Sequence, residues 1–596
     1  MNWFSRELRH WEKQLLRRWR KDLPASLRKS AASSKTLRNG AICGGKRLRL
    51  GILCTCLAFT LAACASLPDS GPVHEGEVNP DSRNPLAQLA TGPIDGSTPE
   101  KLLADFQQAC AAGTYDDFGI AKQFLTSGTR RSWQPKTQVT VLKPKTELKI
   151  VFADGSKLAT GSGQPVLRVN KVGMRQSFRE EETVKYELTK EGGQWRISSL
   201  PDGVVLTNTA FKNAYSKRNV YYWSSDHHFL IPDPRWVPRK NIAQYLLTAL
   251  FSAPTIDLEG AVSATEPITK IPSNLVTMQG RKAMVELPDT LRLRSETEMA
   301  RIYQQVNATL LGIAGIDEVT VSQNGKALPD PAEQSAPVKK QMMLGVKNGA
   351  VIEESDTRSG VFTTAQDLGG EITWPTPGPV GTDFQVAIRG GKELVRLQRG
   401  KAPQVLYRGE NLRVPQVDPW GWAWTGDASK PGDMVAVNSH FQVARVKIPE
   451  GENWKIPFFA LSAPGVRGLI VWQVGYSFQG KMVTVIRGED GTPIQLKVGN
   501  LGTDILSEVA SAAWIDSGQV AVLKPADTPK IQVLAVNSYD ETFEAASKSQ
   551  YLVPNPSNGN VQVVNELGTR LGHIQQSWRV LGNGVSYPAF AASIQR

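Results

Sequence analysis

The sequence contains little of what metal or thiol chemistry requires. Five of its 596 residues are cysteines and six are histidines. Three of the cysteines, Cys54, Cys56 and Cys64, lie in one apolar run, and no histidine or acidic residue lies between Ile42 and Pro68. A structural zinc or iron–sulfur site needs about four convergent ligands. We therefore expect no metal at this run, and no cofactor elsewhere in the chain.

The motifs of the common enzyme classes are also missing. The chain has no G-x-S-x-G, no P-loop, no G-x-G-x-x-G followed by an acidic residue and no C-x-x-C. The histidines that follow the apolar run lie in separate segments, so their spacing supports no Ser/His/Asp arrangement. They are His74, His227, His228, His440 and His573. These absences predict that the chain is not an enzyme.

The stretch Asp226-His227-His228 combines metal-ligating residue types. Adjacent residues on a strand or turn point to opposite faces, so the two histidines cannot easily hold one ion. No second histidine cluster lies near them in the sequence. A hydrated turn is the expected structure here.

The apolar run around the three cysteines is typical of a secretory signal. Lys46, Arg47 and Arg49 precede it, and residues 50–65 carry no charge. The run is shorter than the about 20 apolar residues of a membrane-spanning helix, and it has the basic flank and apolar core of a signal peptide. An uncleaved signal anchor is the alternative.

The end of the run, "LAAC" at residues 61–64, resembles the bacterial lipobox. The resemblance implies cleavage after Ala63, followed by an N-palmitoyl, S-diacylglycerol cysteine at Cys64. This lipid would anchor the chain on the extracytoplasmic face of the cell membrane. Residues 1–63 are then a basic leader with its signal peptide, and residues 64–97, rich in proline and small polar residues, are a flexible tether.

The basic charge of the chain is concentrated in this leader. Residues 1–50 carry 14 basic and three acidic residues, a net +11, and the whole chain carries +13, which leaves +2 after the signal. Two accounts fit the leader: a cytoplasmic positive-inside segment, or a start codon placed upstream of the true one. Neither supports binding to nucleic acid, because net charge argues for such binding only when the folded domains carry it.

Residues 98–212 are predicted to form an α+β domain. Thr98 and Pro99 suit the start of a helix, Gly113 can end it, and Cys110 falls on its apolar face as a buried residue without a disulfide partner. Two hairpins with turns at Asp154-Gly155 and Gly192-Gly193 follow. Helices followed by a curled antiparallel sheet resemble the NTF2-like fold. The domain has no His/Asp pair, so a spacer or docking role is expected.

Residues 213–330 resemble the GerMN domain. The stretch "RKNIAQYLLTALFSAP" predicts an amphipathic helix, and Ser295 and Glu298 form a capping box before a second helix. Strands flank these helices, and an Asn324-Gly325 turn closes the segment. The resemblance implies an α+β module also found in cell-envelope lipoproteins.

Residues 331–341 are a polar linker, and residues 342–596 have β periodicity throughout. Similar strand-rich stretches begin at Leu412, Phe459 and Val509, in steps of 47 and 50 residues. Repeats of about 40–50 residues with four strands each are typical of propeller blades. We expect an all-β propeller of about five or six blades, and a pair of β-sandwiches is the alternative.

Trp420, Trp422 and Trp424 alternate along one predicted strand, so all three should face the same side. Packing between blades is one account of these rings. The other is an exposed aromatic shelf that binds a glycan or a protein partner, which makes the three tryptophans candidate binding residues.

The order of lipobox, α+β domain, GerMN domain and propeller resembles the LpqB family of actinobacterial lipoproteins. The stretches "VPQVDPWGWAWT" and "VASAAWIDSGQVAVL" are similar to the propeller of that family. The resemblance implies an accessory protein of the MtrAB two-component system, which binds the extracellular domain of the sensor histidine kinase MtrB and affects the cell envelope and division. Two alternatives stay open: a lipoprotein that binds peptidoglycan, and a propeller hydrolase of envelope material.

Overall fold

The computed structural model describes residues 90–592, apart from 144–148, 153–158, 179–183, 264–270, 294, 331–341, 356–357, 507 and 555–559. The described residues all belong to one compact unit, Glu77–Arg596. Cys54, Cys56, Ala63 and Cys64, with the leader, the signal and most of the tether, lie outside the described residues. No helix within the described ranges is long and apolar enough to cross a membrane.

Helices open the described chain. The side chain of Thr98 caps α3 by accepting the N–H of Lys101, as predicted. The prediction that Gly113 ends this helix is wrong, because α3 continues to Asp116. A Cβ at position 113 would overlap the ring of Phe118, so the glycine serves packing instead. The helices of this region are α3 (Pro99–Asp116), α4 (Gly119–Lys122), α5 (Ser127–Ser132) and α6 (Asn208–Ala214).

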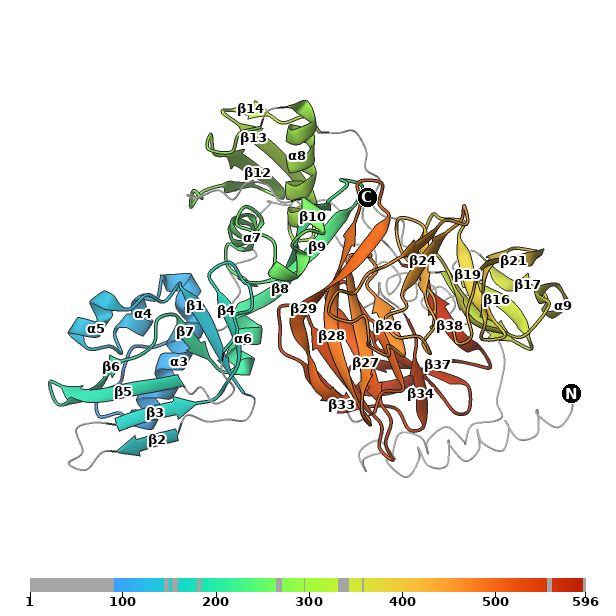
Figure 1. The fold of residues 1–596 in the computed structure, drawn as a ribbon. Helices are drawn as coiled ribbons and strands as arrows, with labels where there is room; N and C mark the ends of the chain where they lie inside the picture. The colour runs from blue at the N-terminus through green and yellow to red at the C-terminus, as the bar shows by residue number, and fades with distance from the viewer. Residues whose placement is uncertain are drawn as a thin grey trace, which may run out of the picture. The chain divides into compact units, whose positions relative to one another are not determined.

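Two sheets lie between α5 and α6 in the sequence (Figure 1). One has the order β2-β3-β5-β6 and the other β4-β1-β7, with β1 and β7 parallel. The single curled sheet of the NTF2-like fold is therefore not confirmed, and the coarser α+β description holds. The strands are β1 (Gln138–Leu142), β2 (Lys149–Phe152), β3 (Ala159–Gly163), β4 (Pro165–Asn170), β5 (Val184–Glu191), β6 (Gln194–Ser199) and β7 (Val204–Leu206).

Cys110 lies in the core of this region as a buried free thiol, as predicted, and burial raises its pKa well above the usual value. The hairpin at Gly192-Gly193 is also confirmed, since both glycines have positive φ between β5 and β6. The turn at Asp154-Gly155 lies outside the described residues, although β2 and β3 on either side of it pair antiparallel.

The next region is built on a long antiparallel ribbon of β8 (Tyr215–Ser224) and β9 (Leu230–Pro238). Helices α7 (Ile242–Leu250) and α8 (Glu296–Leu310) pack against it, and the predicted N-cap of α8, Ser295, accepts the N–H of Glu298. A second sheet has the order β11-β12-β13-β14. Its strands are β11 (Val276–Gln279), β12 (Lys282–Leu287), β13 (Glu318–Gln323) and β14 (Lys326–Ala327). The short strand β10 (Val262–Ser263) pairs instead with β8 of the ribbon.

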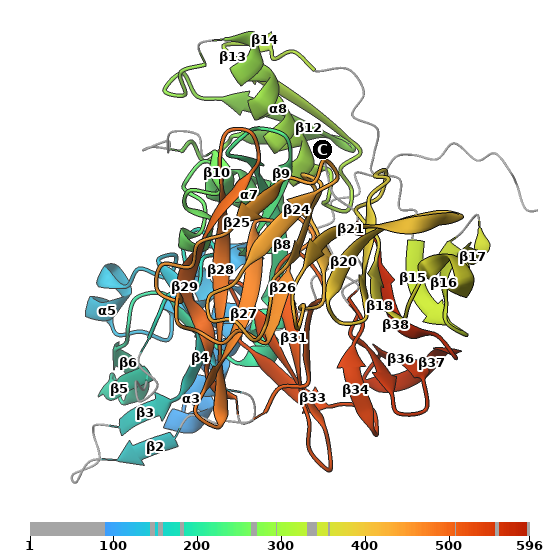
Figure 2. The ribbon, with the colours of Figure 1, turned by 45° about the vertical axis from the view of Figure 1, so that its right-hand side comes forward.

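In the described residues from 342 onward, the only helix is a single turn, α9 (Ala365–Leu368), and the regular structure is otherwise β. The described strands of this C-terminal region form six four-stranded sheets that follow one another along the chain (Figure 2). The last strand, β38 (Ser586–Phe590), pairs with β15 (Met342–Lys347) and so completes the first sheet. This succession is propeller-like rather than a pair of sandwiches.

The first sheet also contains β16 (Ala350–Ser355) and β17 (Ser359–Thr363). The second and third comprise β18 (Ile372–Thr376), β19 (Gln385–Arg389), β20 (Glu393–Gln398), β21 (Lys401–Arg408), β22 (Gln416–Val417), β23 (Trp422–Thr425), β24 (Val435–Asn438) and β25 (Val443–Arg445). The fourth and fifth comprise β26 (Phe458–Leu461), β27 (Arg467–Val474), β28 (Ser477–Arg487), β29 (Pro493–Leu506), β30 (Ser511–Trp514), β31 (Gln519–Lys524), β32 (Lys530–Ala535) and β33 (Glu541–Glu544). The sixth comprises β34 (Ser549–Leu552), β35 (Gln562–Asn565), β36 (Thr569–Ile574) and β37 (Ser577–Asn583).

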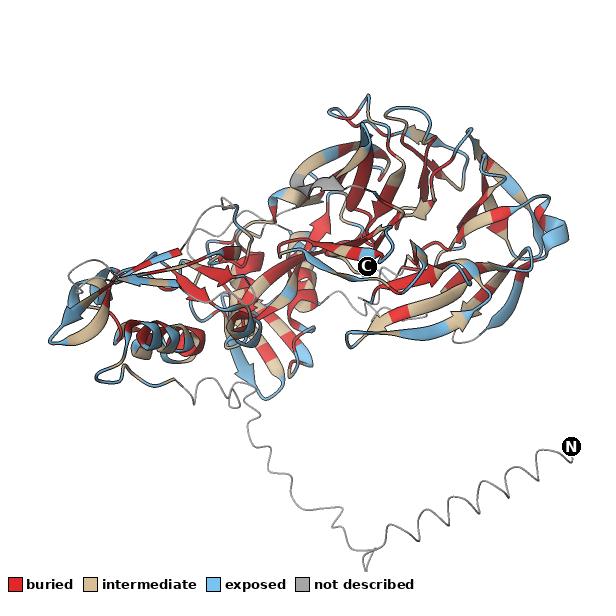
Figure 3. Ribbon diagram, turned by 90° about the horizontal axis from the view of Figure 1, so that it is seen from below, coloured by how far each residue is buried: buried red, intermediate tan, exposed pale blue. Residues whose placement is uncertain are grey.

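Apolar clusters lie between successive sheets of this region. One joins Trp424 of the third sheet to Phe459 and Ile470 of the fourth, and another joins Leu469 of the fourth to Trp514 of the fifth. Figure 3 shows the resulting pattern, in which buried residues concentrate along the central strands and exposed residues along the rim. Burial between sheets, rather than disulfides, therefore stabilises the region.

Candidate functional site: the β8–β9 ribbon and its neighbours

The β8–β9 ribbon contacts helices α6, α7 and α8 and is hydrogen-bonded to both neighbouring regions of the chain. Three prolines of β9 pair with β8 residues: Pro232 with Tyr221, Pro234 with Asn219 and Pro238 with Tyr215. Proline has no N–H to donate, so these positions belong to the pairs of an antiparallel ladder that exchange no hydrogen bonds. In such pairs the backbone polar groups of both residues point away from the partner strand. The ribbon thus presents polar backbone on both outer edges.

The outer edge of β9 is satisfied by three different parts of the chain. The carbonyl of Pro232 accepts a hydrogen bond from Arg467 Nη1 (2.9 Å), and that of Pro234 accepts one from Asn537 Nδ2 (2.6 Å). The N–H of Trp236 donates to the carbonyl of Gly173 (3.1 Å). Each of these bonds ties the ribbon to a residue far away in the sequence.

The outer edge of β8 is covered in part by α8. Thr309 Oγ1 accepts the N–H of Tyr221 (3.2 Å), and Gln305 Nε2 donates to the carbonyl of Tyr221 (3.0 Å). Both helix residues are buried. Side chains of the helix thus occupy the positions that a further strand would otherwise take.

A buried ion network lies under β9. Asp233 is fully buried, and its carboxylate accepts hydrogen bonds from Arg235 Nη2 (2.7 Å) and from the hydroxyl and N–H of Thr255. Arg467, only 2% exposed, adds Nη2–Oδ1 at 3.4 Å to Asp233 and Nε–Oδ2 at 2.6 Å to Asp257. Two arginines and two aspartates balance in charge, which is the condition under which buried ions persist.

The same network shifts the acidity of Asp257. Burial acts to raise the pKa of its carboxyl, but the charge and hydrogen bond of Arg467 outweigh burial and lower the pKa. The backbone of Asp257 is held as well, because its carbonyl accepts the hydroxyl of Thr484 on β28. The network therefore joins β9, the segment after α7, and the fourth C-terminal sheet.

Asn537 is a second junction residue. Its backbone has φ +60°, and its side chain is buried. The side-chain amide donates to the carbonyls of Pro234 and Gly173, and its oxygen accepts the N–H of Arg175. One side chain of the C-terminal region thus bonds residues from both preceding regions.

The rings of Trp422 and Trp424 pack between sheets, which is the first of the two accounts of this stretch, and they do not form an exposed shelf. Trp422 and Trp424 lie on β23, and both rings are buried against neighbouring sheets; Trp424 Nε1 donates to the buried carboxylate of Asp418 (2.7 Å). Trp420 precedes the strand, in the turn. Alternation along a strand predicts which side chains share a face, but it does not predict what covers that face. Here the neighbouring sheets cover the face of β23 that carries Trp422 and Trp424, so it is part of the core.

Trp420 instead contacts the ribbon. Its indole N–H donates to Asp226, its ring lies at 4.8 Å from the ring of Phe229, and the guanidinium of Arg487 stacks at 3.8 Å on it. The Asp226-His227-His228 stretch is therefore a turn used for docking. His227 Nε2 lies 3.0 Å from Ser263 Oγ, and the described residues contain no group of three or more metal-ligating side chains.

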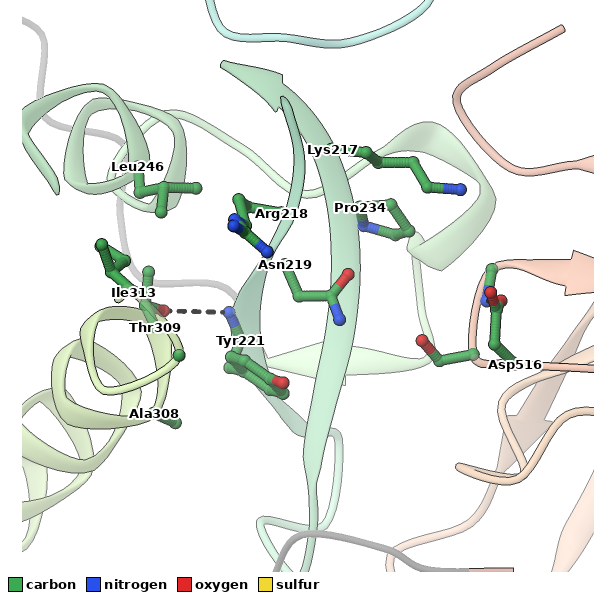
Figure 4. Close-up of a pocket in the computed structure, with 13 residues that line it drawn as sticks. Lys217, Arg218, Asn219, Tyr221, Pro234, Leu246, Ala308, Thr309, Ile313 and Asp516 are labelled. Carbon is green, nitrogen blue, oxygen red and sulfur yellow. Dashed lines mark hydrogen bonds between the residues drawn. The ribbon is translucent and has the colours of Figure 1, made fainter. Parts of the chain in front are cut away.

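A cavity of about 300 Å³ opens at the uncovered part of β8 (Figure 4). Its polar lining includes Lys217, Arg218 and Asn219 from β8 and Asp516 from the turn after β30. Its apolar lining comes from α7, the end of α8 and Pro234. Burial lowers the pKa of Lys217 and raises that of Asp516, because the cavity wall disfavours the charged form of each group.

Sequence reasoning missed this junction. Arg467, Asp233 and Asn537 stand in no recognisable motif, and their partners lie hundreds of residues away. One local signal was available: the alternating prolines of "IPDPRWVP" remove N–H donors from one side of the strand. They therefore mark a sheet edge whose carbonyls other segments must satisfy.

Three family models match the chain. Residues 92–212 match "Lipoprotein LpqB, N-terminal domain", residues 219–329 match "Sporulation and spore germination", and residues 365–591 match "Lipoprotein LpqB beta-propeller domain". The chain is thus a multidomain lipoprotein with a GerMN-like domain and a large, propeller-like all-β region. It belongs to the LpqB family.

Relatives named Lipoprotein LpqB support this family assignment. Lipoprotein LpqB of Rhodococcus opacus (strain B4) is 32% identical over 255 residues, which are 40% of this chain and 40% of the relative, so this match spans about two fifths of the relative's length. Lipoprotein LpqB of Streptomyces avermitilis is 27% identical over 544 residues, covering 81% of this chain and 88% of the relative. Among solved structures, TolB from Acinetobacter baumannii covers 53% of this chain and 98% of its own at 12% identity, with a TM-score of 0.33 that is too low to support a functional argument.

Proposed function

We propose that this chain is a lipid-anchored binding protein of the extracytoplasmic face, which binds and modulates the extracellular domain of an MtrB-like sensor histidine kinase. Membership of the LpqB family supports the proposal. Its C-terminal region acts in this view as a six-bladed propeller, a common scaffold for protein binding. The anchor is the diacylglycerol and palmitoyl lipid on Cys64, and the chain performs no catalysis of its own.

The observation that carries the proposal is the buried junction around Arg467 and Asn537. These two residues bond the C-terminal sheets to β9 and to the first α+β region. A chain whose regions are joined by buried hydrogen bonds presents its exposed faces at fixed spacing, which lowers the ordering cost of binding a partner. Tethering at the membrane raises the effective concentration near a membrane-bound kinase to about the millimolar range for a short linker.

Retention of the kinase domain by the full chain tests this function. The chain, purified in detergent, is immobilised and exposed to the extracellular domain of the MtrB-like kinase of the same cell. We expect retention, and we expect Arg467→Met to weaken it while Arg445→Met, at an exposed ion pair, leaves it unchanged. Crosslinking of the native lipoprotein in its membrane supplies a second readout. Absence of the kinase from both experiments would remove the proposal.

Binding to peptidoglycan remains the alternative prediction, although the buried tryptophans no longer support it. Co-sedimentation of the full chain with purified peptidoglycan distinguishes the two functions. Sedimentation together with no retention of the kinase domain would favour the wall-binding function.

A further inference from the structure

The uncovered part of β8 leaves backbone hydrogen-bonding groups facing the cavity. Asn219 pairs with Pro234 and Lys217 with Trp236, in the same alternation as Tyr221 with Pro232. Because Pro234 has no N–H, the N–H and C=O of Asn219 point away from β9. Lys217 and Trp236 form another pair without hydrogen bonds between them, because the N–H of Trp236 points away from β8 and donates to the carbonyl of Gly173.

Helix α8 stops before it covers these groups. Its residues Gln305 and Thr309 satisfy Tyr221, but α8 ends at Leu310, and Gly312 and Ile313 turn away to form one wall of the cavity. The opposite wall is the turn that contains Asp516 and Gly518. Figure 4 shows Lys217 and Asn219 extending from the ribbon toward Asp516. Helix α8 therefore covers the edge of β8 at Tyr221 but leaves it open at Asn219, two residues earlier on the same side of the strand.

The charges around this edge select a ligand. Neither Lys217 nor Arg218 has a carboxylate within ion-pair distance among the described residues, and Asp516 is the single carboxylate in the cavity lining. Two cations and one anion leave a net positive charge. A ligand that carries a carboxylate is therefore favoured over a neutral or basic one.

We propose that this cavity binds an extended peptide segment that carries an acidic side chain, and that the segment adds a short strand to the edge of β8. The N–H and C=O of Asn219 supply the ladder hydrogen bonds, and Lys217, whose side chain lies on the same face of β8 as that of Asn219, pairs with the carboxylate. The edge from Lys217 to Asn219 spans about 7 Å, and a cavity of about 300 Å³ lies at the small end of ligand sites. The site thus takes about two or three residues. It goes beyond the kinase proposal and does not depend on it.

Hydrogen exchange measured by mass spectrometry tests the strand addition. The full chain in detergent is mixed with a pool of N-acetylated, C-amidated tetrapeptides that have glutamate fixed at the second position and Val, Thr, Ala or Leu elsewhere. We expect slower exchange in the peptic fragment that contains Lys217–Asn219. A pool with glutamine in place of glutamate should need about tenfold higher concentration for the same protection. Unchanged exchange at millimolar peptide, or equal protection by both pools, would overturn the proposal.

Variants locate the binding. A Cβ at Gly312 would meet no atom within 4 Å, so Gly312→Leu can place a side chain at the cavity wall without a backbone clash. We expect Gly312→Leu and Lys217→Met each to weaken binding of the glutamate pool about tenfold or more. Lys185→Met, at an exposed lysine of β5, is the matched control and should bind like the wild type. Thermal unfolding confirms that each variant is folded, and wild-type binding by a folded Gly312→Leu would contradict the proposal.

Discussion

Arg467 on β27 donates to the carboxylate of Asp233 on β9, across 234 residues of sequence, with Nη2–Oδ1 at 3.4 Å. The same guanidinium holds Asp257 and the carbonyl of Pro232. All five donors of an arginine lie in one plane, so a single side chain can bind three acceptors from different segments at once. This geometry makes Arg467 the main connection between the ribbon and the fourth C-terminal sheet.

Arg467→Met should therefore lower the free energy of unfolding by about 3 kcal/mol, because it leaves the partly buried Asp257 without a cation and leaves the fully buried Asp233 with only Arg235. Urea unfolding followed by tryptophan fluorescence measures the change. The control is Arg445→Met, whose side chain is 76% exposed and whose ion pair with Asp433 spans 3.6 Å. Its effect should stay below about 1 kcal/mol. Equal midpoints for the two variants would show that the buried network contributes nothing.

Asn537 offers a test that separates hydrogen bonding from backbone strain. Asn537→Gly keeps the positive φ at low cost but removes the bonds to Pro234, Gly173 and Arg175, so it should cost about 1–3 kcal/mol. Asn537→Ala should cost about 1 kcal/mol more, because alanine also resists this φ.

The matched control for this pair is Asn348, in the exposed turn between β15 and β16, which has φ +52°. Asn348→Gly should change the midpoint of urea unfolding little, because the turn tolerates glycine equally well. If Asn537→Gly were as mild as Asn348→Gly, the hydrogen bonds of the Asn537 amide would not stabilise the junction.

Local signals predicted the three longest described helices, α3, α7 and α8, and several hairpin turns. The caps at Thr98 and Ser295 and the turns at Gly192-Gly193 and Asn324-Gly325 are properties of a few adjacent residues, so they can be predicted without knowing the fold. The blade-like repeats were predicted from a different signal, the recurrence of similar stretches along the chain. Gly113 shows the limit of this reasoning. The same glycine suits a helix end and a tight contact, and only the position of Phe118 decides between them.

The junction could not be predicted in this way. The pairing of β1 with β7, which replaces the expected curled sheet, and the bonds of Arg467 and Asn537 all join residues far apart in the sequence. The period of two predicted that Trp422 and Trp424 share a face of their strand, but their burial depends on the neighbouring sheets that cover them. Contacts of this kind follow from topology, which no local pattern specifies.

Lipid attachment at Cys64 is a prediction from the sequence alone. Cys64→Ser should abolish incorporation of radioactive fatty acid into the chain, because the thiol is the atom to which the lipobox resemblance assigns the diacylglycerol. Cys56→Ser, within the same apolar run, should label like the wild type. Labelling that survives in Cys64→Ser would instead support the uncleaved signal anchor.

The last prediction concerns pH and Asp516. Burial raises the pKa of this carboxyl above its ordinary value, although the Gly518 N–H and Lys217 act against the shift. A carboxyl that binds its proton more tightly in the folded state destabilises the fold as pH rises through the folded pKa. Asp516→Asn removes that cost and can keep the acceptor for Gly518, so the variant should unfold at higher urea than the wild type near about pH 8, with the difference shrinking toward about pH 4.

Asp490 is the control, because its pKa is shifted down where that of Asp516 is shifted up. Its carboxylate accepts hydrogen bonds from the N–H and hydroxyl of Thr492, which lower its pKa, so its contribution to stability is present at neutral pH and is lost as pH falls. Asp490→Asn should therefore lower the midpoint at about pH 8 while Asp516→Asn raises it. If Asp516→Asn lowered the midpoint at both pH values, that carboxylate would be a structural group.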